Sequence, residues 1–415
     1  METLLTKRVL AFEVEAVRRD FPILNRRIGK VPLIYLDNAA TTQKPLEVID
    51  RIDRFYRSGN ANIHRGLHRL SEEATADYEN ARRKVAAFLG EVDAESIIFT
   101  RGATESINLV AASFLKPRLV RGQTILLTEM EHHANIVPWQ LLAEEVGAKI
   151  EVVPVTDEGE LDYGEAERLL SAQPALFALV QISNTLGTVN RVEELLAVAR
   201  SAGVPVLLDG AQAVPHRQVD LRQLDPDFYV FSGHKVFGPT GIGVLYGKPE
   251  HLKEMRPYQG GGDMIDRVSF RGTTFAPPPA RFEAGTPHIC GGIGLGASID
   301  YLGKMDREGA ERHEARLLEG LEAGLDAIPG VRRLGHAAER VGAVSFVVDG
   351  IHPHDLSTFL DQAGIAVRAG HHCTQPLMER FKVPATTRAS VSFYNTSEEV
   401  EQFLVQLEKT IEILR

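Results

Sequence analysis

The sequence predicts an α/β fold built on a largely parallel sheet. Between residues 97 and 246, short apolar segments with the length of strands alternate with longer segments of helical periodicity. This alternation is typical of parallel sheets, whose strands are joined by crossover helices. The chain has 415 residues, which exceeds one ordinary core, so two or three domains are expected.

The composition excludes several classes of protein. Hydrophobic residues make up 44% and charged residues 25%, as in soluble globular proteins. The 46 basic and 56 acidic residues give a net charge of −10, which attracts neither nucleic acid nor an anionic membrane. No apolar run is long enough to span a bilayer, and the first 19 residues lack a signal-peptide core. Two cysteines, Cys290 and Cys373, provide no disulfide framework and fit a reducing cytoplasm.

Three helices and one brief strand are expected before residue 90. Apolar spacing predicts a short amphipathic helix over residues 12–24 that ends near Pro22. A brief strand is expected at 34–36, followed by helices over 45–57 and 71–89.

The alternating region then begins with a strand at 97–99, a polar turn and a helix over 106–115. Free amides at such a helix start can bind an anion. Further strands are expected at 124–128, 149–153, 176–181, 204–208, 227–231 and 242–246. Further helices are expected at 134–146, 163–171 and 191–202.

The C-terminal third reads as a loop followed by a separate unit. Residues 256–287 are rich in glycine, proline and arginine and are expected to form a long functional or interface loop. A helix is expected over 306–327. After Pro329-Gly330, strands near 343–348 and 388–394 and helices near 355–363 and 397–413 indicate a smaller α+β domain.

A lysine follows the strand at 227–231, in Ser232-Gly233-His234-Lys235. An isolated lysine of this kind is more often a solvated loop residue. If it is partly desolvated, however, its pKa falls and its amine becomes a nucleophile able to form a Schiff base. Ser232 and His234 could hold a phosphate beside it.

An aspartate at the neighbouring strand end strengthens this interpretation. Asp209 follows the strand at 204–208 and precedes Lys235 by 26 residues. Alone it could be a turn or capping residue. Pyridoxal phosphate (PLP) requires both an acid partner for its pyridine nitrogen and a lysine for its imine, and the ends of parallel strands gather at one ligand crevice.

Other polar residues also follow predicted strands. His132 and His133 come after the strand at 124–128, and an imidazole there could stack on a cofactor ring or lie on the surface. Asn184 could bind a substrate carboxylate or the ring oxygen, or serve as a turn residue.

The second candidate nucleophile is Cys373, in Arg368-Ala369-Gly370-His371-His372-Cys373. Positive surroundings favour the reactive thiolate, whereas Cys290 lies among uncharged residues and reads as an apolar filler. A zinc site is a competing interpretation. Adjacent histidines rarely point at one ion, and neither CxxC nor HxxxH spacing is present, so no resident metal is expected. The potential zinc ligands in that interpretation are His132, His133, His371, His372 and Cys373.

Taken together, these motifs resemble a PLP-dependent cysteine desulfurase of the SufS (class II) type, in the aminotransferase class V family. The resemblance covers nearly the whole chain. The matching stretches are residues 35–41, 62–66, 101–105, 131–135, 209–212, 232–235, 281–287, 368–376 and 388–390. Ala103 departs from the pattern, since relatives often have threonine there, which implies one weaker phosphate contact. Cys290 departs as well, at a position where a small polar residue is common.

The resemblance implies fold type I, with a large domain built on a mainly parallel seven-stranded sheet, and a homodimer. The implied organisation is an N-terminal segment at 1–31 that packs with the small domain, a large PLP-binding domain at 32–300 and a small C-terminal domain at 301–415 that carries the cysteine loop.

Site roles also follow from the resemblance. Lys235 would carry the cofactor imine, Asp209 would pair with the pyridine nitrogen, and His132 would stack on the ring. The other implied cofactor contacts are Gln212, Thr104, Ser232 and His234, with Thr286 supplied by the partner subunit. The implied substrate-binding residues are Asn184, Arg388, Arg368 and His64. Cys373 would be the nucleophile.

The implied reaction converts L-cysteine to L-alanine and places the sulfur on Cys373 as a persulfide, which passes to an acceptor for iron–sulfur cluster assembly in the cytoplasm. Residues 351–355, with His354, resemble the type that works with a zinc-containing SufU-like partner rather than a SufE-like one. The alternatives are a selenocysteine lyase or a cysteine sulfinate desulfinase. A sulfur carrier without PLP is disfavoured by the Lys235 and Asp209 pair.

Overall fold

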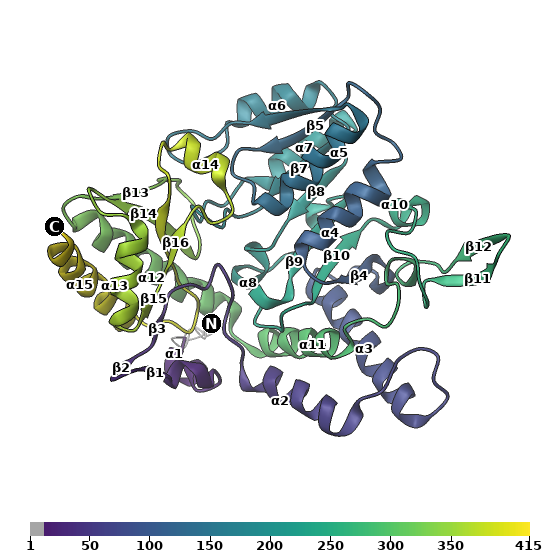
Figure 1. The fold of residues 1–415 in the computed structure, drawn as a ribbon, viewed down its shortest axis with the longest axis horizontal. Helices are drawn as coiled ribbons and strands as arrows, with labels where there is room; N and C mark the ends of the chain where they lie inside the picture. Colours follow the sequence, from purple (N-terminus) through teal and green to yellow (C-terminus); the bar gives the residue numbers. More distant parts are fainter. Residues whose placement is uncertain (1–11) are drawn as a thin grey trace, which may run out of the picture.

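The computed structural model describes residues 12–415, so the first eleven residues of the expected N-terminal segment lie outside the described part. A seven-stranded sheet forms the centre of the larger unit, in the order β4-β10-β9-β8-β7-β5-β6 (Figure 1). The strands from β9 to β6 are parallel, and β10 is antiparallel to both of its neighbours. The predicted α/β fold with a mainly parallel seven-stranded sheet is confirmed.

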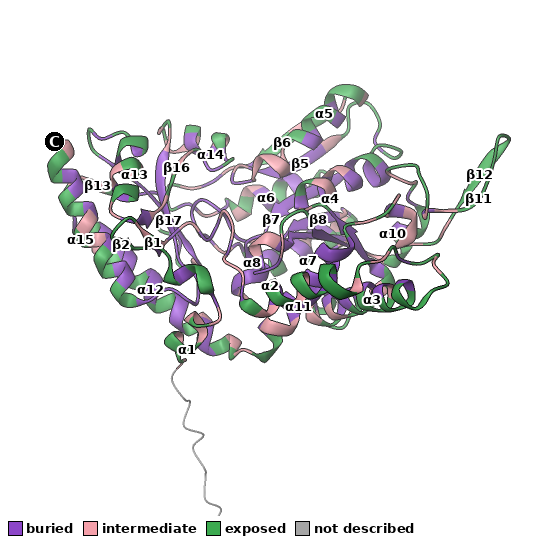
Figure 2. Ribbon diagram, turned by 60° about the horizontal axis from the view of Figure 1, so that its bottom comes forward, coloured by how far each residue is buried: buried purple, intermediate pink, exposed green. Residues whose placement is uncertain are grey.

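The strands of this sheet lie within about two residues of their predicted positions. They are β4 (Ile97–Thr100), β5 (Thr124–Thr128), β6 (Lys149–Val153), β7 (Leu176–Val180), β8 (Val206–Asp209), β9 (Phe228–Ser232) and β10 (Gly243–Gly247). Most are buried on both faces, as the purple strands in Figure 2 show, because helices cover the sheet. Continuous apolar segments are the sequence pattern that such burial requires.

Most helices of the larger unit also match the prediction. They are α2 (Leu46–Arg54), α3 (Arg69–Phe88), α4 (Ala103–Leu109), α5 (Val137–Val146), α6 (Tyr163–Ser171) and α7 (Val192–Ala202). The helix starting after the 97–99 strand begins at Ala103 rather than 106. The expected helix over 12–24 is two short pieces, α1 (Val14–Arg18) and a 3-10 turn from Pro22 to Asn25, because Pro22 disfavours helical geometry in the residue before it.

Several elements were not predicted, and the most prominent are a helix and a hairpin. Helix α11 (Ile289–Lys304) is glycine-rich, and it packs so closely on α3 that a Cβ at Gly296 would lie 2.7 Å from the Cβ of Ala81. The expected 256–287 loop contains a hairpin, β11 (Ile265–Ser269) and β12 (Gly272–Phe275), which projects from the body (Figure 1). Its exposed strands lack the buried apolar face by which a sequence pattern reveals a strand.

The C-terminal unit has its own sheet, in the antiparallel order β13-β14-β17-β16, and its own hydrophobic core. Strand β17 begins two residues before the predicted 388–394 strand and ends at Ser390. The elements of this unit are α12 (Arg307–Ala327), β13 (Val331–Arg333), β14 (Ala343–Val348), α13 (Pro353–Gln362), β15 (Ile365–Ala366), β16 (Arg368–Gly370), α14 (Gln375–Arg380), β17 (Thr386–Ser390) and α15 (Ser397–Leu414). The remaining short elements are β1 (Arg27–Ile28), β2 (Val31–Pro32), α8 (Ala213–His216), α9 (Leu221–Leu224) and α10 (Pro249–Glu254).

An early strand joins the C-terminal unit. Strand β3 (Ile34–Tyr35) pairs in parallel with β15, and Ile34 and Leu36 lie in the C-terminal core. Arg18 of α1 forms an ion pair with Glu399 of α15 at 2.8 Å. Residues 34–36 therefore lie against the smaller unit, and the expected domain limits at 1–31, 32–300 and 301–415 remain predictions.

Across residues 12–415, no helix combines the length and the apolar character needed to cross a bilayer.

Candidate active site

One pocket lies at the carboxyl ends of the parallel strands, where the smaller unit meets the sheet. Asp209 is the last residue of β8, and Lys235 ends the 3-10 turn that follows β9. Because β8 and β9 are parallel neighbours, their ends bring these two residues together. The predicted site residues that line this pocket are Thr104, His132, Asn184, Asp209, Gln212, Ser232, His234, Lys235, Arg368, Cys373 and Arg388.

Two predicted site residues lie elsewhere in this chain. Thr286 is exposed in a separate cavity that includes Tyr78 and Arg101. His64 lies in a third cavity, where its Nε2 is 3.0 Å from Glu79. The single chain therefore does not bring either side chain to the pocket.

Burial shifts the pKa values of both Lys235 and Asp209. Burial lowers the pKa of Lys235 to about 8, although the nearby Asp209 carboxylate opposes the shift. Burial also raises the pKa of Asp209, whose Oδ1 accepts a hydrogen bond from the Ala211 N–H at 2.9 Å. The other carboxylate oxygen remains available to a ligand, and the lysine amine loses its proton far more readily than in water.

His132 is held over the pocket in its neutral form. Burial and the positive charge of Lys235 lower its pKa to about 3, and its Nδ1 accepts a hydrogen bond from the Ala134 N–H at 3.0 Å. The loop that carries His132 is fixed by the buried Glu131 carboxylate, which accepts hydrogen bonds from the Thr128 hydroxyl, the Val180 N–H and the Asn135 amide. A fixed neutral imidazole is suited to stacking on a ring.

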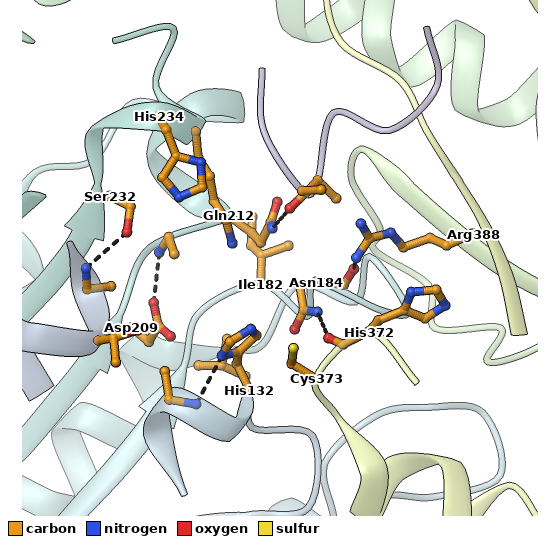
Figure 3. Close-up of a pocket in the computed structure, with 18 of the residues that line it drawn as sticks. His132, Ile182, Asn184, Asp209, Gln212, Ser232, His234, His372, Cys373 and Arg388 are labelled. Carbon is orange, nitrogen blue, oxygen red and sulfur yellow. Dashed lines mark hydrogen bonds between the residues drawn. The ribbon is translucent and has the colours of Figure 1, made fainter. Parts of the chain in front are cut away.

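The end of the pocket next to Ser232 and His234 is rich in hydrogen-bond donors (Figure 3). The Ala103 N–H, at the start of α4, donates to the Ser232 Oγ at 2.9 Å, and Thr104 and His234 also line this end. Gly243 allows β10 to lie close to the turn before α4, because a Cβ at Gly243 would lie 2.4 Å from the Gly102 Cα. Backbone amides and hydroxyls gathered at a helix start fit a phosphate group.

Arginines form the wall on the side of the smaller unit. Arg388 is buried, donates to the Asn184 carbonyl at 2.9 Å and pairs with Asp37 at 3.3 Å. Arg368 forms a two-pronged pair with the same carboxylate, at 3.0 and 2.8 Å. Sequence reasoning missed Asp37 as the anchor of both arginines, although it follows the predicted strand at 34–36 just as Asp209 follows its strand.

Lys44 is a second residue that sequence reasoning missed. Its amine donates to the carbonyls of Thr42 at 2.6 Å and His234 at 2.8 Å, and burial lowers its pKa to about 7. The His234 carbonyl also accepts hydrogen bonds from the hydroxyls of Thr41 and Thr42. Residues 41–44 thus hold the turn that carries Lys235, a long-range contact with no local sequence signal.

Cys373 reaches the pocket from an exposed loop. His372 and Cys373 both adopt left-handed backbone angles, with φ of 51° and 58°, which turns the loop sharply before α14. The Asn184 amide holds the loop by donating to the His372 carbonyl at 2.8 Å (Figure 3). Cys290, in contrast, is buried in the hydrophobic core, in agreement with its interpretation as a filler.

The residues present fit PLP. A lysine with a lowered pKa, a buried aspartate, a neutral histidine and a donor-rich helix start converge on one pocket, as the chemistry of this cofactor requires. Two buried polar atoms of the pocket wall, the Asn184 Oδ1 and the Arg388 Nε, have no hydrogen-bond partner within residues 12–415. Such atoms are expected where a polar ligand completes the site.

Comparisons with known proteins agree with this geometry. Residues 34–403 match the model of the aminotransferase class-V family. A cysteine desulfurase of Serratia proteamaculans is 50% identical over 98% of this chain and 100% of its own length. The apo structure of a cysteine desulfurase from Thermococcus onnurineus is 42% identical, with a TM-score of 0.92 over 96% of this chain and 98% of that one. The structure of the Escherichia coli cysteine desulfurase CsdA in an S-sulfonic acid form is 40% identical, with a TM-score of 0.90 over 97% and 100%.

The chain belongs to the aminotransferase class-V family of PLP-dependent enzymes, and the predicted family, cofactor and fold type are confirmed. A more distant relative of known structure, a C-DES mutant at 25% identity and a TM-score of 0.79 over 94% of this chain and 98% of that one, carries glycine linked to its PLP. Within the family, the chain belongs with the PLP-dependent cysteine desulfurases. Its assignment to the SufS type stays a prediction.

Proposed function

We propose that this enzyme converts L-cysteine to L-alanine and transfers the sulfur as a Cys373 persulfide to an acceptor for iron–sulfur cluster assembly. One observation carries the proposal. Cys373 is exposed, yet it lines the same pocket as Lys235 and Asp209. A nucleophilic thiol is thereby placed beside a site suited to PLP, while the other cysteine is buried elsewhere.

The proposed cofactor contacts follow from the pocket. Lys235 would bind PLP covalently, Asp209 would face the pyridine nitrogen, His132 would stack on the ring and Gln212 would reach the ring hydroxyl. Thr104, Ser232 and His234 would hold the phosphate. When bound, PLP accepts the electron pair that the departing Cα proton of the substrate leaves behind.

Asn184, Arg388 and Arg368 would bind the substrate carboxylate, because they supply positive charge and an amide on the side of the pocket nearest Cys373. Lys235, whose pKa of about 8 lies near neutrality, would act as the general base that removes the Cα proton.

Cys373 would then attack the substrate sulfur as a thiolate. The new bond is S–S, the bond that breaks is Cβ–S, and the electron pair of that bond ends on Cβ, which is protonated. One cysteine and one enzyme thiol thus give one alanine and one enzyme persulfide. The step balances without an external oxidant or reductant.

Homodimer formation is part of the proposal. Thr286 is exposed in its own cavity, away from the pocket of its own chain, as expected of a residue that serves the partner's phosphate. His64 likewise lies outside the pocket, so its proposed substrate role depends on assembly.

The proposed acceptor is a SufU-like protein, with a SufE-like protein as the alternative, and the proposed location is the cytoplasm. His354, in the first turn of α13, is exposed, as a zinc ligand shared with a SufU-like partner would need to be. Adding each type of acceptor to the purified enzyme and comparing the stimulation of turnover distinguishes the two.

The central test is a turnover assay on the PLP-loaded enzyme with L-cysteine, measuring alanine and sulfide with and without a thiol reductant. Cys373→Ala and Lys235→Ala are both expected to lose cysteine turnover, and only Lys235→Ala is expected to lose the absorbance of covalently bound cofactor. Full activity of Cys373→Ala on cysteine would refute the persulfide mechanism. Rates on selenocysteine and cysteine sulfinate in the same assay then measure the two alternative activities.

A further inference from the structure

The loop that carries Cys373 brings together three side chains that can bind a metal. Donor atoms of His133, His371 and Cys373 all lie within 4.8 Å of one another, and the two imidazole rings have centroids 5.4 Å apart. His133 is half-buried, whereas His371 and Cys373 are exposed, so an ion has direct access. Only one histidine of each adjacent pair takes part. His132 lines the pocket, and the Nε2 of His372 contacts the Thr386 hydroxyl at 2.7 Å.

The lone pairs of the two rings converge on the same short stretch of backbone. The Nδ1 of His371 accepts from the Cys373 N–H at 3.1 Å, and the Nε2 of His133 accepts from the Gln375 N–H at 3.0 Å. Each accepting nitrogen is therefore unprotonated, which is the state that a metal ligand must have. An ion could replace these two hydrogen bonds without moving a proton between the nitrogens of either ring.

The backbone fixes the position of the cluster. The His133 N–H donates to the Cys373 carbonyl at 2.7 Å, which ties the two loops together. The positive side chains of Arg368 and Arg388 are nearby, but both are paired with Asp37, which reduces their repulsion of a cation. One thiolate and two imidazoles with an open fourth position form a typical ligand set for zinc.

We propose that His133, His371 and Cys373 form an inhibitory site for Zn²⁺ or a similar soft divalent ion. The inhibitory effect rests on the proposed function, because Cys373 is the sulfur nucleophile there. Binding releases the thiol proton to solvent and leaves two imidazoles neutral, and no oxidation or reduction occurs. The thiolate electron pair is then held in a metal bond, so the metal-bound enzyme cannot attack the substrate sulfur.

The test uses the PLP-loaded enzyme and chelator-buffered Zn²⁺, with affinity measured by competition against a chromogenic chelator. His133→Asn and His371→Asn are the informative variants, because the amide oxygen still accepts a backbone hydrogen bond but is a poor zinc ligand. Each is expected to weaken one-to-one zinc binding by at least about tenfold. His336→Asn, which changes an exposed histidine outside the cluster, is the matched control and is expected to bind zinc as the unchanged enzyme does.

A second readout does not depend on turnover. Zinc is expected to slow alkylation of Cys373 in the unchanged enzyme and to lose this effect in the His133→Asn/His371→Asn double variant. Equal zinc affinity in all variants, absence of one-to-one binding, or alkylation that zinc does not slow would each overturn the proposal. Cysteine turnover without zinc, measured on the same preparations, tests the proposed function separately from the metal site.

Discussion

The two walls of the active-site pocket are built in opposite ways. The sheet wall presents Asp209 and Lys235 at the ends of buried parallel strands, and Asp209 is only 4% exposed. The loop wall presents Cys373 on an exposed segment with left-handed backbone angles, held to the sheet side by a few hydrogen bonds such as that from Asn184.

The difference matches the two chemical tasks. Cofactor chemistry depends on shifted pKa values, and burial produces those shifts at Lys235, Asp209 and His132. The proposed sulfur transfer requires a thiol that can reach a second protein, and burial would prevent that. The pocket therefore combines a buried, fixed wall with an accessible wall, as the proposed proton chemistry and the proposed sulfur delivery would each require.

The largest effect is expected on the sheet wall. Asp209→Asn should lower kcat by on the order of 10³-fold, because it removes a preorganised charge from the buried position proposed to face the cofactor. The cofactor should still be captured by Lys235, as measured by absorbance. Asp157→Asn changes an exposed aspartate and is the matched control. An unaltered kcat in Asp209→Asn would show that this wall does not need its charge.

On the side of the smaller unit, where Asp37 anchors the two arginines, Asp37→Asn should raise the KM for cysteine by about tenfold, equivalent to about 1.4 kcal/mol. Without the carboxylate, Arg368 and Arg388 lose their anchor, and the buried Arg388 loses its ionic partner. Unfolding in urea should show a loss of about 3 kcal/mol in stability. Asp77→Asn, which breaks a surface ion pair with Arg51, controls for a general loss of charge. A KM equal to that of the control would argue against the anchoring role.

The pH dependence of cofactor capture tests the lowered pKa of Lys235 on the sheet wall. Only the neutral amine reacts with PLP, and the neutral fraction of Lys235, with a pKa of about 8, increases with pH and then levels off. The capture rate of the apoenzyme should rise only about 1.1-fold between pH 9 and pH 10, against about eightfold for a lysine with an ordinary pKa. Stopped-flow absorbance measures this rate, and a continued steep rise would contradict the lowered pKa.

The smallest effect concerns the second cysteine. Cys290 lies in the core on α11, so Cys290→Ala should cost about 1 kcal/mol of stability and leave turnover unchanged. Thermal unfolding and the alanine assay check both parts. A loss of turnover would mean that the core under the pocket is coupled to the chemistry.

Sequence patterns predicted the sheet well because its strands are buried and apolar, and they predicted Asp209 and Lys235 because both follow such strands. Helix α11 was not predicted, because its glycines allow close packing with α3, a contact distant in sequence. Sequence patterns also missed the anchoring role of Asp37 and the contacts of Lys44, because their partners lie some 190 to 350 residues away. The position of His64 outside the pocket was not anticipated, whereas the resemblance already implied that Thr286 serves the partner subunit.

The pairing of β3 with β15 has a consequence for the order in which the protein can be completed. The ribosome makes residues 34–44 early, but the strand that receives Ile34 and Tyr35 emerges more than three hundred residues later. The same segment holds the Lys235 turn through Thr41, Thr42 and Lys44. Because β15 is made so late, the segment that braces the Lys235 turn cannot be secured against the smaller unit until the chain is nearly finished.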